Sequence, residues 1–414
     1  MKLHIVGGFL GSGKTTAINN AAGHLASKGK KVGIITNEQS EDKQDNTIVC
    51  ANYSPSEVVI NNSFSSNLDN LSDKVVRLHQ DAQPDYLFAE SVGSCTDLVA
   101  TVLKPLMIFY DNIFESLTLS IIVDARMLLS YLKGEKLLFG DEVIYIFRKQ
   151  IEEADLLVIN KIDLLADEDF QVLKKCIHQS LSDKHIITQN SFNPQNTENW
   201  LATLESLPQR KRTSLEIDYQ SYGKGETALT WLDEEITFSN LNNEAGEYAV
   251  RFIDNMLIEI NEKQLPIGHL TFTLVDGEKG HEISITTYDL TDWKKNFSPI
   301  ASNKIKLIMN ARLETTYEAL NAIVNNNIAT LSNQGVNVTK STKVLVSPGI
   351  PKLIHHSSSP FHCCEECICL KKLLARNEIR KAEGSEKAMA ELEDENFECL
   401  GLCGECGEGD GCCC

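Results

Sequence analysis

Near the start of the chain the sequence reads Gly8-Phe9-Leu10-Gly11-Ser12-Gly13-Lys14-Thr15, which fits the phosphate-loop pattern G-x-x-x-x-G-K-[ST]. The apolar run from Leu3 to Val6 predicts a strand before this loop, and residues 15 to 27 predict a helix after it. Glycines let the backbone fold closely around a phosphate, so that successive N–H groups point inward. The stretch therefore predicts a nucleoside triphosphate site. The flanking strand and helix disfavour the alternative of a glycine-rich turn that happens to precede a lysine.

The residue types of this loop assign roles to its side chains. Lys14 is expected to place its ammonium between the β- and γ-phosphates, and Thr15 to give its hydroxyl to Mg²⁺. The N-terminal end of the following helix adds positive partial charge. The nucleotide-binding residues expected here are Gly8, Gly11, Ser12, Gly13, Lys14, Thr15 and Thr16.

A second motif points to the base of the nucleotide. The buried-strand run Leu156 to Ile159 ends directly in Asn160-Lys161-Ile162-Asp163, the N-K-x-D pattern of GTP-binding proteins. In that pattern the aspartate accepts hydrogen bonds from the guanine ring N–H and exocyclic amine, while Asn160 and Lys161 brace the loop. Adenine would leave Asp163 unpaired, at a cost of about 1 to 3 kcal/mol. The sequence therefore favours GTP over ATP.

A third strand end lies between these two motifs. The apolar run Tyr86 to Ala89 leads into Glu90-Ser91-Val92-Gly93, an E-x-x-G motif. An acid at this position can hold the water shell of Mg²⁺, and a glycine three residues later lets a backbone N–H reach the γ-phosphate. Glu90 and Gly93 are therefore candidate catalytic residues.

The order of these motifs, with Asn37-Glu38, Val123-Asp124-Ala125 and Gln150-Ile151-Glu152 between them, resembles the CobW-like GTPases. These are relatives of the nickel-inserting GTPases that mature urease and hydrogenase. The resemblance covers about residues 1 to 205. It implies GTP with Mg²⁺ as ligands, a slow intrinsic GTPase and nucleotide-linked dimerisation. With Lys14 stabilising γ-phosphate charge, Glu38 or Glu90 would join Thr15 in holding Mg²⁺ or its waters.

The chain departs from the family at its internal metal motif. Many members carry C-x-C-C between the phosphate loop and E-x-x-G, whereas here serines stand at 63, 65 and 66. A serine hydroxyl is a hard, weak ligand, and zinc, cobalt and nickel prefer the softer thiolate. The internal soft-metal site is therefore expected to be missing. Cys95, near Glu38 and Asp45 of an expected switch segment, is either a lone functional thiol or, as we favour, a small buried hydrophobe.

Composition limits the classes of function. At 414 residues the chain exceeds one core, and its formal charge of −19 with no clustered basic face argues against a nucleic acid partner. The first strand leaves no room for a signal peptide, and no apolar run approaches the roughly 20 residues that span a bilayer. We expect a cytoplasmic protein without membrane contact.

The alternation of strands and helices predicts an α/β fold of the P-loop NTPase type, with a doubly wound, mostly parallel sheet. Further strands are expected at 32–36, 86–90, 117–124, 156–160 and 185–188, within a GTPase domain spanning residues 1–207. Residues 208–212 form a linker. A smaller α+β domain follows at 215–350, with strands at 228–238, 268–275, 281–287 and 304–310 and helices at 245–263 and 315–331. In it, His269 is either a metal or partner contact or, as we favour, a hydrogen-bonded structural histidine.

The tail at 355–414 concentrates thiols, since it holds ten of the 13 cysteines. Spacings of two or three residues between thiols suit a tetrahedral metal ion. The ligands fall into two groups, at 355–369 and at 399–414, and each group offers enough of them for one site. Disulfides are disfavoured in a reducing cytoplasm, and a passive thiol reservoir remains an alternative, as does a preformed structural zinc site. The candidate ligands are His362, Cys363, Cys364, Cys367, Cys369, Cys399, Cys403, Cys406, Cys412, Cys413 and Cys414.

Taken together, the sequence predicts a GTP-dependent metallochaperone that hands a metal or metal cofactor to a client metalloprotein. Zinc or cobalt is the favoured metal, with nickel as an alternative. Two other functions remain open: a GTP-gated regulator of a cobalamin-dependent enzyme, and a metal-storage protein with a vestigial GTPase.

Overall fold

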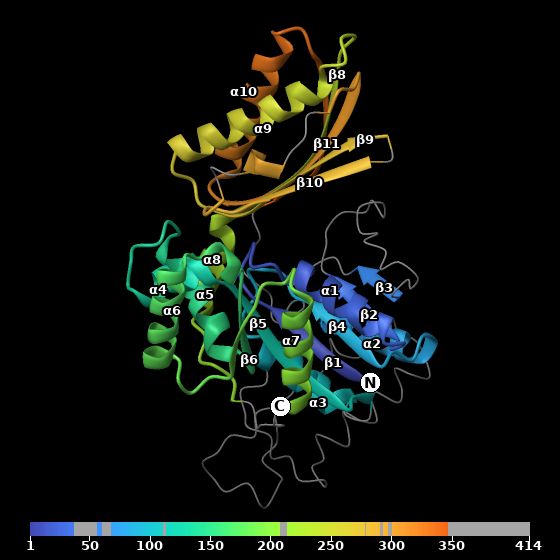
Figure 1. Ribbon diagram of the computed structural model, residues 1–414, viewed down its shortest axis with the longest axis vertical. Helices are drawn as coiled ribbons and strands as arrows, with labels where there is room; N and C mark the ends of the chain where they lie inside the picture. The colour runs from blue at the N-terminus through green and yellow to red at the C-terminus, as the bar shows by residue number, and fades with distance from the viewer. Residues whose placement is uncertain are drawn as a thin grey trace, which may run out of the picture.

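The computed structural model describes residues 1–36, 56–59, 68–110, 113–207, 213–277, 279–289, 293–296 and 300–346. These residues form two β-sheets, each covered by helices, and Figure 1 shows the sheets one above the other with helix α8 (Tyr219–Ala228) at their junction. We call them the first sheet and the second sheet, and we call each sheet with its helices and connecting turns the first unit and the second unit.

The first sheet is built from short apolar runs. Within the described residues it has seven parallel strands in the order β3-β2-β4-β1-β5-β6-β7. Strands buried on both faces have no solvent-facing side, so the central runs are mostly apolar. Their buried polar exceptions include His4 and Thr118, which hydrogen-bond to each other at 2.7 Å. The strands are β1 (Lys2–Gly7), β2 (Val32–Thr36), β3 (Ser56–Val59), β4 (Tyr86–Glu90), β5 (Ser116–Asp124), β6 (Leu156–Asn160) and β7 (Ile186–Thr188).

Helices cover both faces of the first sheet. On one face α1 (Lys14–Ser27) and α7 (Pro194–Ser206) pack against β-strand residues such as Phe88, where Trp200 is fully buried. A larger hydrophobic cluster fills the other face. The helices that contribute to it are α2 (Leu68–Asp81), the π-helix η2 (Val99–Leu103) with α3 (Lys104–Tyr110), α4 (Ala125–Leu132), α5 (Asp141–Glu153) and α6 (Asp167–Ser180).

The second sheet is antiparallel. Among the described residues its strand order is β10-β9-β11-β8-β12. Helices α9 (Ala245–Glu262) and α10 (Tyr317–Ser332) lie on the face directed away from the first sheet (Figure 1). Alternate residues therefore face a hydrophobic layer, as in the buried, half-exposed alternation of β11. The strands are β8 (Leu229–Ser239), β9 (Ile267–Asp276), β10 (Lys279–Ile285), β11 (Lys304–Glu314) and β12 (Asn337–Val346).

The fold class predicted from the sequence is confirmed. Strands β2, β4 and β6 have the predicted bounds, and the two helices expected in the second unit are present as α9 and α10. Strands β3 and β12 and helix α8 were not predicted, and β11 runs four residues further than expected, to Glu314. The linker expected at 208–212 lies outside the described residues. Among the described helices, none combines the length and apolar character needed to cross a bilayer.

Candidate functional site

The phosphate loop connects β1 to α1 and holds its lysine inside. Gly8 adopts a φ of 129°, and a Cβ there would lie 2.0 Å from the carbonyl oxygen of Ile122, so no side chain fits. The Lys14 ammonium donates to the carbonyls of Gly8 (2.9 Å) and Phe9 (3.2 Å), and the residue is 7% exposed. Burial lowers the pKa of Lys14, and the nearby charge of Lys161 acts in the same direction. The loop thus presents a cation with few protein partners, which a phosphate group would complete.

Two further predicted residues meet at this loop. The Thr15 hydroxyl lies 2.9 and 3.0 Å from the two carboxylate oxygens of Glu90, the last residue of β4. Hydroxyl and carboxylate oxygens are ligands that Mg²⁺ accepts, so the donor set fits that ion or its waters. Gly93 contacts the tip of the loop, where a Cβ would come within 2.7 Å of Leu10 Cδ2. The E-x-x-G motif and the phosphate loop are therefore in direct contact.

The N-K-x-D loop follows β6 and is joined to the phosphate loop. The Asn160 side-chain amide donates to the Ser12 carbonyl (2.9 Å), while its oxygen accepts from the backbone N–H (3.1 Å) and hydroxyl (2.9 Å) of Ser191. Lys161 has a φ of 62°, in the left-handed region, and Asp163 is exposed at the start of the short 3₁₀-helix η4 (Ile162–Leu164). One buried amide thus fixes the base loop against the phosphate loop, with the carboxyl of Asp163 open to a ligand.

An ion-pair network behind the base loop was not anticipated in detail. The Lys161 ammonium lies 3.2 Å from Asp124 Oδ2, and the same oxygen lies 2.7 Å from Arg126 Nη2. Arg126 also pairs with Asp289 of the second unit, at 2.6 Å. The sequence signal for Asp124 was its place at the end of an apolar strand, whereas nothing in the sequence pointed to Asp289.

Residues of the second unit touch the loop tip. A Cβ on Gly11 would lie 2.5 Å from Thr286 Cγ2 and 2.6 Å from the Gly268 carbonyl oxygen. The neighbouring His269 is half-buried, and its Nδ1 has no hydrogen-bond partner among the described residues. The hydrogen-bonded role that we favoured for His269 is therefore not found at that nitrogen. Burial, with the charges of Arg312, Lys14 and Lys161, lowers its pKa to about 3, so the ring is neutral.

A buried group of acids lies just beyond Gly93. Tyr219 of α8 donates to Asp97, and Glu153 at the end of α5 accepts from the Thr96 hydroxyl (3.2 Å) and the Val99 backbone N–H (3.3 Å). Burial and the charge of Asp97 raise the pKa of Glu153 to about 8. We call the buried carboxyl groups of Asp97 and Glu153, with the half-buried Tyr219, the buried acid cluster. It ties the loop after E-x-x-G to the helix that leads into the second sheet.

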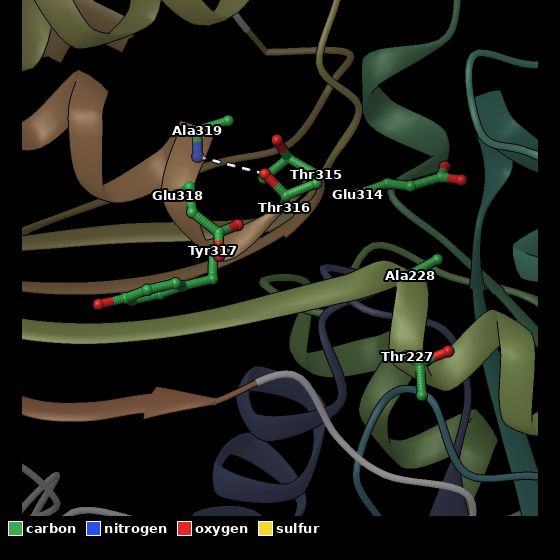
Figure 2. A pocket seen from close by; sticks show the side chains of 8 residues that line it. All are labelled: Thr227, Ala228, Glu314, Thr315, Thr316, Tyr317, Glu318 and Ala319. Carbon is green, nitrogen blue, oxygen red and sulfur yellow. Dashed lines mark hydrogen bonds between the residues drawn. The ribbon is translucent and has the colours of Figure 1, made fainter.

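A hollow lies at the junction of the two units, away from the phosphate and base loops. Figure 2 shows it lined by the end of α8 and the start of α10, where the Thr316 hydroxyl accepts from the Ala319 backbone N–H at 3.3 Å. It includes no residue of the phosphate loop or the base loop. It is therefore separate from the candidate nucleotide site.

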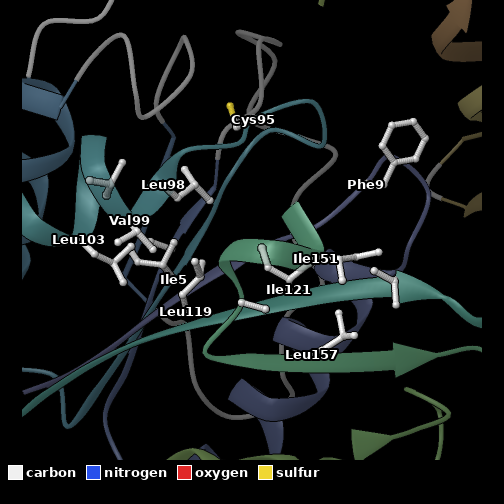
Figure 3. Close-up of a cluster of buried hydrophobic side chains, with 14 of the residues drawn as sticks. Ile5, Phe9, Cys95, Leu98, Val99, Leu103, Leu119, Ile121, Ile151 and Leu157 are labelled. Atoms are coloured by element: carbon white, nitrogen blue, oxygen red, sulfur yellow. The ribbon is translucent and has the colours of Figure 1, made fainter. Parts of the chain in front are cut away.

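The predicted transition-metal residues are placed only in part. Cys95 is fully buried and belongs to the hydrophobic cluster of the first sheet (Figure 3), which supports its reading as a buried hydrophobe. Glu38, Asp45 and the serines at 63, 65 and 66 lie outside the described residues, as does the whole tail from His362 to Cys414. In the described part of the chain, no three His, Cys, Asp or Glu side chains are grouped so that they could hold a metal ion.

The chain is similar to several solved structures. Hydrogenase maturation factor HypB from Archaeoglobus fulgidus is 18% identical over 50% of this chain and 89% of its own, with a TM-score of 0.34. HypB from Helicobacter pylori, in complex with nickel, is 15% identical over 52% of this chain and 92% of its own, with a TM-score of 0.35. The Zn(II)-bound YjiA GTPase from E. coli is 15% identical over 79% of this chain and 98% of its own, with a TM-score of 0.34.

A family model gives the clearer result. Residues 2–188 match the model described as CobW/HypB/UreG, nucleotide-binding domain. The match begins at β1 and ends at the last residue of β7, so it spans the first sheet and the phosphate, E-x-x-G and N-K-x-D motifs. Residues 2–188 therefore form a nucleotide-binding domain of the CobW/HypB/UreG type, and the match covers somewhat less than half of the chain.

Proposed function

We propose that the protein binds and hydrolyses GTP and uses the cycle to deliver a transition metal, or a metal cofactor, to a client metalloprotein. The observation that carries the proposal is the convergence of three motifs on one loop. Thr15 contacts Glu90, Gly93 contacts Leu10, and Asn160 donates to the Ser12 carbonyl. Sequence segments far apart in the chain thus form one nucleotide site.

At the phosphate end, Lys14 supplies the charge. Its ammonium would turn from the Gly8 and Phe9 carbonyls to the β- and γ-phosphates, exchanging neutral acceptors for charged ones. Thr15 and Glu90 would hold Mg²⁺ or its waters, which neutralises charge that develops on the γ-phosphoryl group. The backbone N–H of Gly93 would respond to the presence of the γ-phosphate. Glu38 stays a candidate second acid for the ion.

At the base end, Asp163 would select guanine. Its exposed carboxyl can accept two hydrogen bonds along one edge of a base, and guanine offers two donors there. Asn160, held on both sides of its amide, keeps the loop at a fixed place relative to the phosphate loop. Recognition of the base and of the phosphates would therefore be geometrically linked.

The metal would be carried by the tail. Ten of the 13 cysteines lie in residues 363–414, and the serines at 63, 65 and 66 replace the thiolates that many relatives have. Soft thiolates suit zinc or cobalt, and closely spaced ones can pass an ion on by ligand exchange. Nucleotide-dependent ordering of switch segments would then decide when the ion is released, within a nucleotide-linked homodimer. Clustered thiols stay reduced in the cytoplasm, where we place the protein.

The proposed division of the chain is a GTPase domain at 1–207, an α+β domain at 215–350 and the metal-binding tail at 355–414. Two observations support the first boundary. The second sheet has a hydrophobic cluster of its own, apart from Leu229 and Trp231 of β8, which pack into the cluster of the first sheet. Helix α7, the last helix packed on the first sheet, ends at Ser206.

A paired measurement of turnover and metal content tests the proposal. Protein is purified anaerobically as the full chain and without residues 355–414, and GTP hydrolysis and bound zinc, cobalt and nickel are measured with GTP and with GDP. We expect turnover in both forms and about one or two metal ions per chain in the full form only, because after truncation the three thiols left, Cys50, Cys95 and Cys176, are far apart in sequence.

Two serine-substituted chains serve as matched controls, one altered at Cys363, Cys364, Cys367 and Cys369 and the other at Cys399, Cys403 and Cys406. Loss of one ion in each would assign one site to each group. Tight metal binding by the truncated chain would overturn the role of the tail. A full chain that retains no metal would favour the GTP-gated regulator, and metal content that never responds to nucleotide would favour storage.

A further inference from the structure

A turn of the second unit, Thr286 to Asp289, reaches the nucleotide site from outside. We propose that Asp289 acts through Arg126 and Asp124 as a positioning residue of the base-reading loop, so that guanine recognition depends on the seating of the second unit. The inference rests on the proposed function, since it concerns how the same site reads its base.

The conformation of the base loop depends on an ion pair that fixes the Lys161 side chain. This lysine adopts a left-handed backbone conformation, with a φ of 62°, which is unfavourable for a residue with a side chain. Its ammonium is fixed by Asp124, at 3.2 Å, and the Asp124 side chain is 8% exposed. Asp163, two residues on, has an exposed carboxyl that the backbone of this loop must aim. The Asp124 carboxylate therefore sets the position of Lys161 and, through it, of the base-reading residue.

Arg126 in turn fixes Asp124. Its Nε donates to Oδ1 (3.1 Å) and its Nη2 to Oδ2 (2.7 Å), so both carboxylate oxygens are held by one planar guanidinium. The backbone N–H of Arg126 also donates to Oδ1, at 2.9 Å, as the cap of α4. Two-point pairing fixes orientation as well as distance. Because the Arg126 side chain is only 14% exposed, water does little to screen the pair.

Asp289 holds the other edge of Arg126. Arg126 Nη1 donates to Asp289 Oδ1 (2.6 Å), and the guanidinium lies 5.3 Å from the centre of the Tyr288 ring. The Thr286 hydroxyl (2.6 Å) and backbone N–H (3.1 Å) both donate to Asp289 Oδ2. Burial acts to raise the pKa of Asp289, but the hydrogen bonds from Arg126 and Thr286 outweigh it and the pKa is lowered. The carboxylate is therefore charged near neutral pH and is oriented by its own turn.

The same turn also touches the phosphate end of the site. Thr286 Cγ2 would lie 2.5 Å from a Cβ on Gly11, so its methyl group closes over the loop tip. One short turn thus contacts the phosphate loop directly and the base loop through three charged side chains. If the turn withdraws, Arg126 loses one of its two carboxylate partners and Asp124 no longer has a fixed counter-ion geometry.

The test compares guanine and adenine nucleotides on the full chain. Dissociation constants for GDP and ADP, with Mg²⁺, and kcat for GTP are measured for the unaltered protein, for Asp289→Asn and for Arg126→Met. We expect each variant to weaken GDP binding about 3- to 10-fold with ADP binding unchanged, since adenine does not use the base-reading aspartate. The double variant should lose no more than the larger single loss, because the two residues act in series.

Two more variants keep the test decisive if Asp289→Asn folds poorly. Thr286→Val keeps the methyl near Gly11 but removes the hydroxyl that orients Asp289, so a smaller loss in the same direction is expected. Asp254→Asn removes a half-buried carboxyl that pairs with Lys294 on the same unit, and it should change neither constant. Equal weakening of GDP and ADP binding, which leaves the ratio of the two dissociation constants unchanged, overturns the inference. Failure of the unaltered chain to bind guanine nucleotide overturns the proposed function, and the inference with it.

Discussion

The two sheets present their polar residues in opposite ways. In the first sheet the strands are buried on both faces, so the functional polar residues lie where the parallel strands end. Glu90, Asp124 and Asn160 are the last residues of β4, β5 and β6. In the second sheet polar residues alternate along each strand, as in β11, and the residues that reach the nucleotide site come from a turn and a strand start. The first arrangement yields recognisable motifs, whereas the second yields none.

The largest effect is expected from removing the buried lysine of the phosphate loop, at the end of the first sheet where the polar residues meet. Lys14→Ala should weaken GTP binding by about 4 kcal/mol, because the phosphates lose their only counter-charge at this position of the loop. Nucleotide titration and thermal unfolding are measured together. Near-normal turnover in the variant would contradict the phosphate-loop assignment, and a collapsed melting curve would indicate a structural role instead.

The buried acid cluster, where the two regions join, predicts a pH effect on stability. Burial and the charge of Asp97 raise the pKa of Glu153 from 4.5 to about 8. Because the folded state holds this proton more tightly, its contribution is fully present below pH 4.5 and is lost as the pH rises toward 8. Glu153→Gln should therefore be the more stable protein at pH 7, by about 3 kcal/mol, with the difference vanishing near pH 4.5.

Denaturant unfolding at pH 5, 6, 7 and 8 measures how the free energy of unfolding changes with pH. Glu152→Gln is the matched control, since Glu152 is the neighbouring residue of the same helix and its side chain is 39% exposed. Parallel pH profiles for the unaltered protein and Glu153→Gln would show that Glu153 is ionised in the folded state.

Base selection gives a smaller and more specific effect. Asp163→Asn should cost about 2 kcal/mol of the preference for GTP over ATP, because an amide cannot accept both hydrogen bonds from guanine. Competition among GTP, ATP and xanthosine triphosphate measures the ranking, and xanthosine triphosphate should gain relative to GTP. If the ranking does not change, the base is read by other residues.

The contact between the two regions can be probed at the loop tip. Gly11 and Gly29 both have positive φ, 69° and 77°, but a Cβ on Gly11 would meet Thr286 and Gly268 whereas one on Gly29 would meet nothing within 4 Å. Gly29→Ala therefore measures backbone strain alone. Gly11→Ala should be less stable than this control by about 1 kcal/mol, measured without nucleotide. Equal losses of stability in the two variants would mean that the second unit moves away from this contact at no measurable cost.

The sequence was sufficient for the parts of the molecule that local pattern controls. Buried runs such as Leu156 to Asn160 predicted strands with correct bounds, and the motif at each strand end placed the phosphate and base loops. Helix α8 was missed because it contains Gly223 and Gly225, which are poor helix formers. Gly225 packs so closely on α5 that a Cβ would lie 2.5 Å from the Glu142 carbonyl oxygen. Strand β12 was missed because its lysine, serine and threonine residues hide the alternation.

The parts of the site that sequence did not predict depend on distant contacts. Arg126 and Asp289 are 163 residues apart, and neither lies in a pattern that names the other. The acid cluster is similar, since Asp97 and Tyr219 are 122 residues apart and their meeting depends on how α8 packs. Pairings of this kind are set by tertiary packing, which a local reading of one sequence does not include.

Helix α8 and strand β8 have a mechanical consequence. The helix ends at Ala228 and the strand begins at Leu229, whose ladder with β11 starts at once with Glu314, so no linker residue lies between them. At the other side, the helix is anchored through Tyr219 to Asp97 and through the Tyr222 hydroxyl to the Thr96 backbone N–H. A hinge needs residues whose backbone angles can change freely, and this junction has none. Any rotation of the second sheet must therefore rotate α8 with it. Because Tyr219 and Tyr222 of α8 bind the loop that follows Gly93, that rotation would displace this loop.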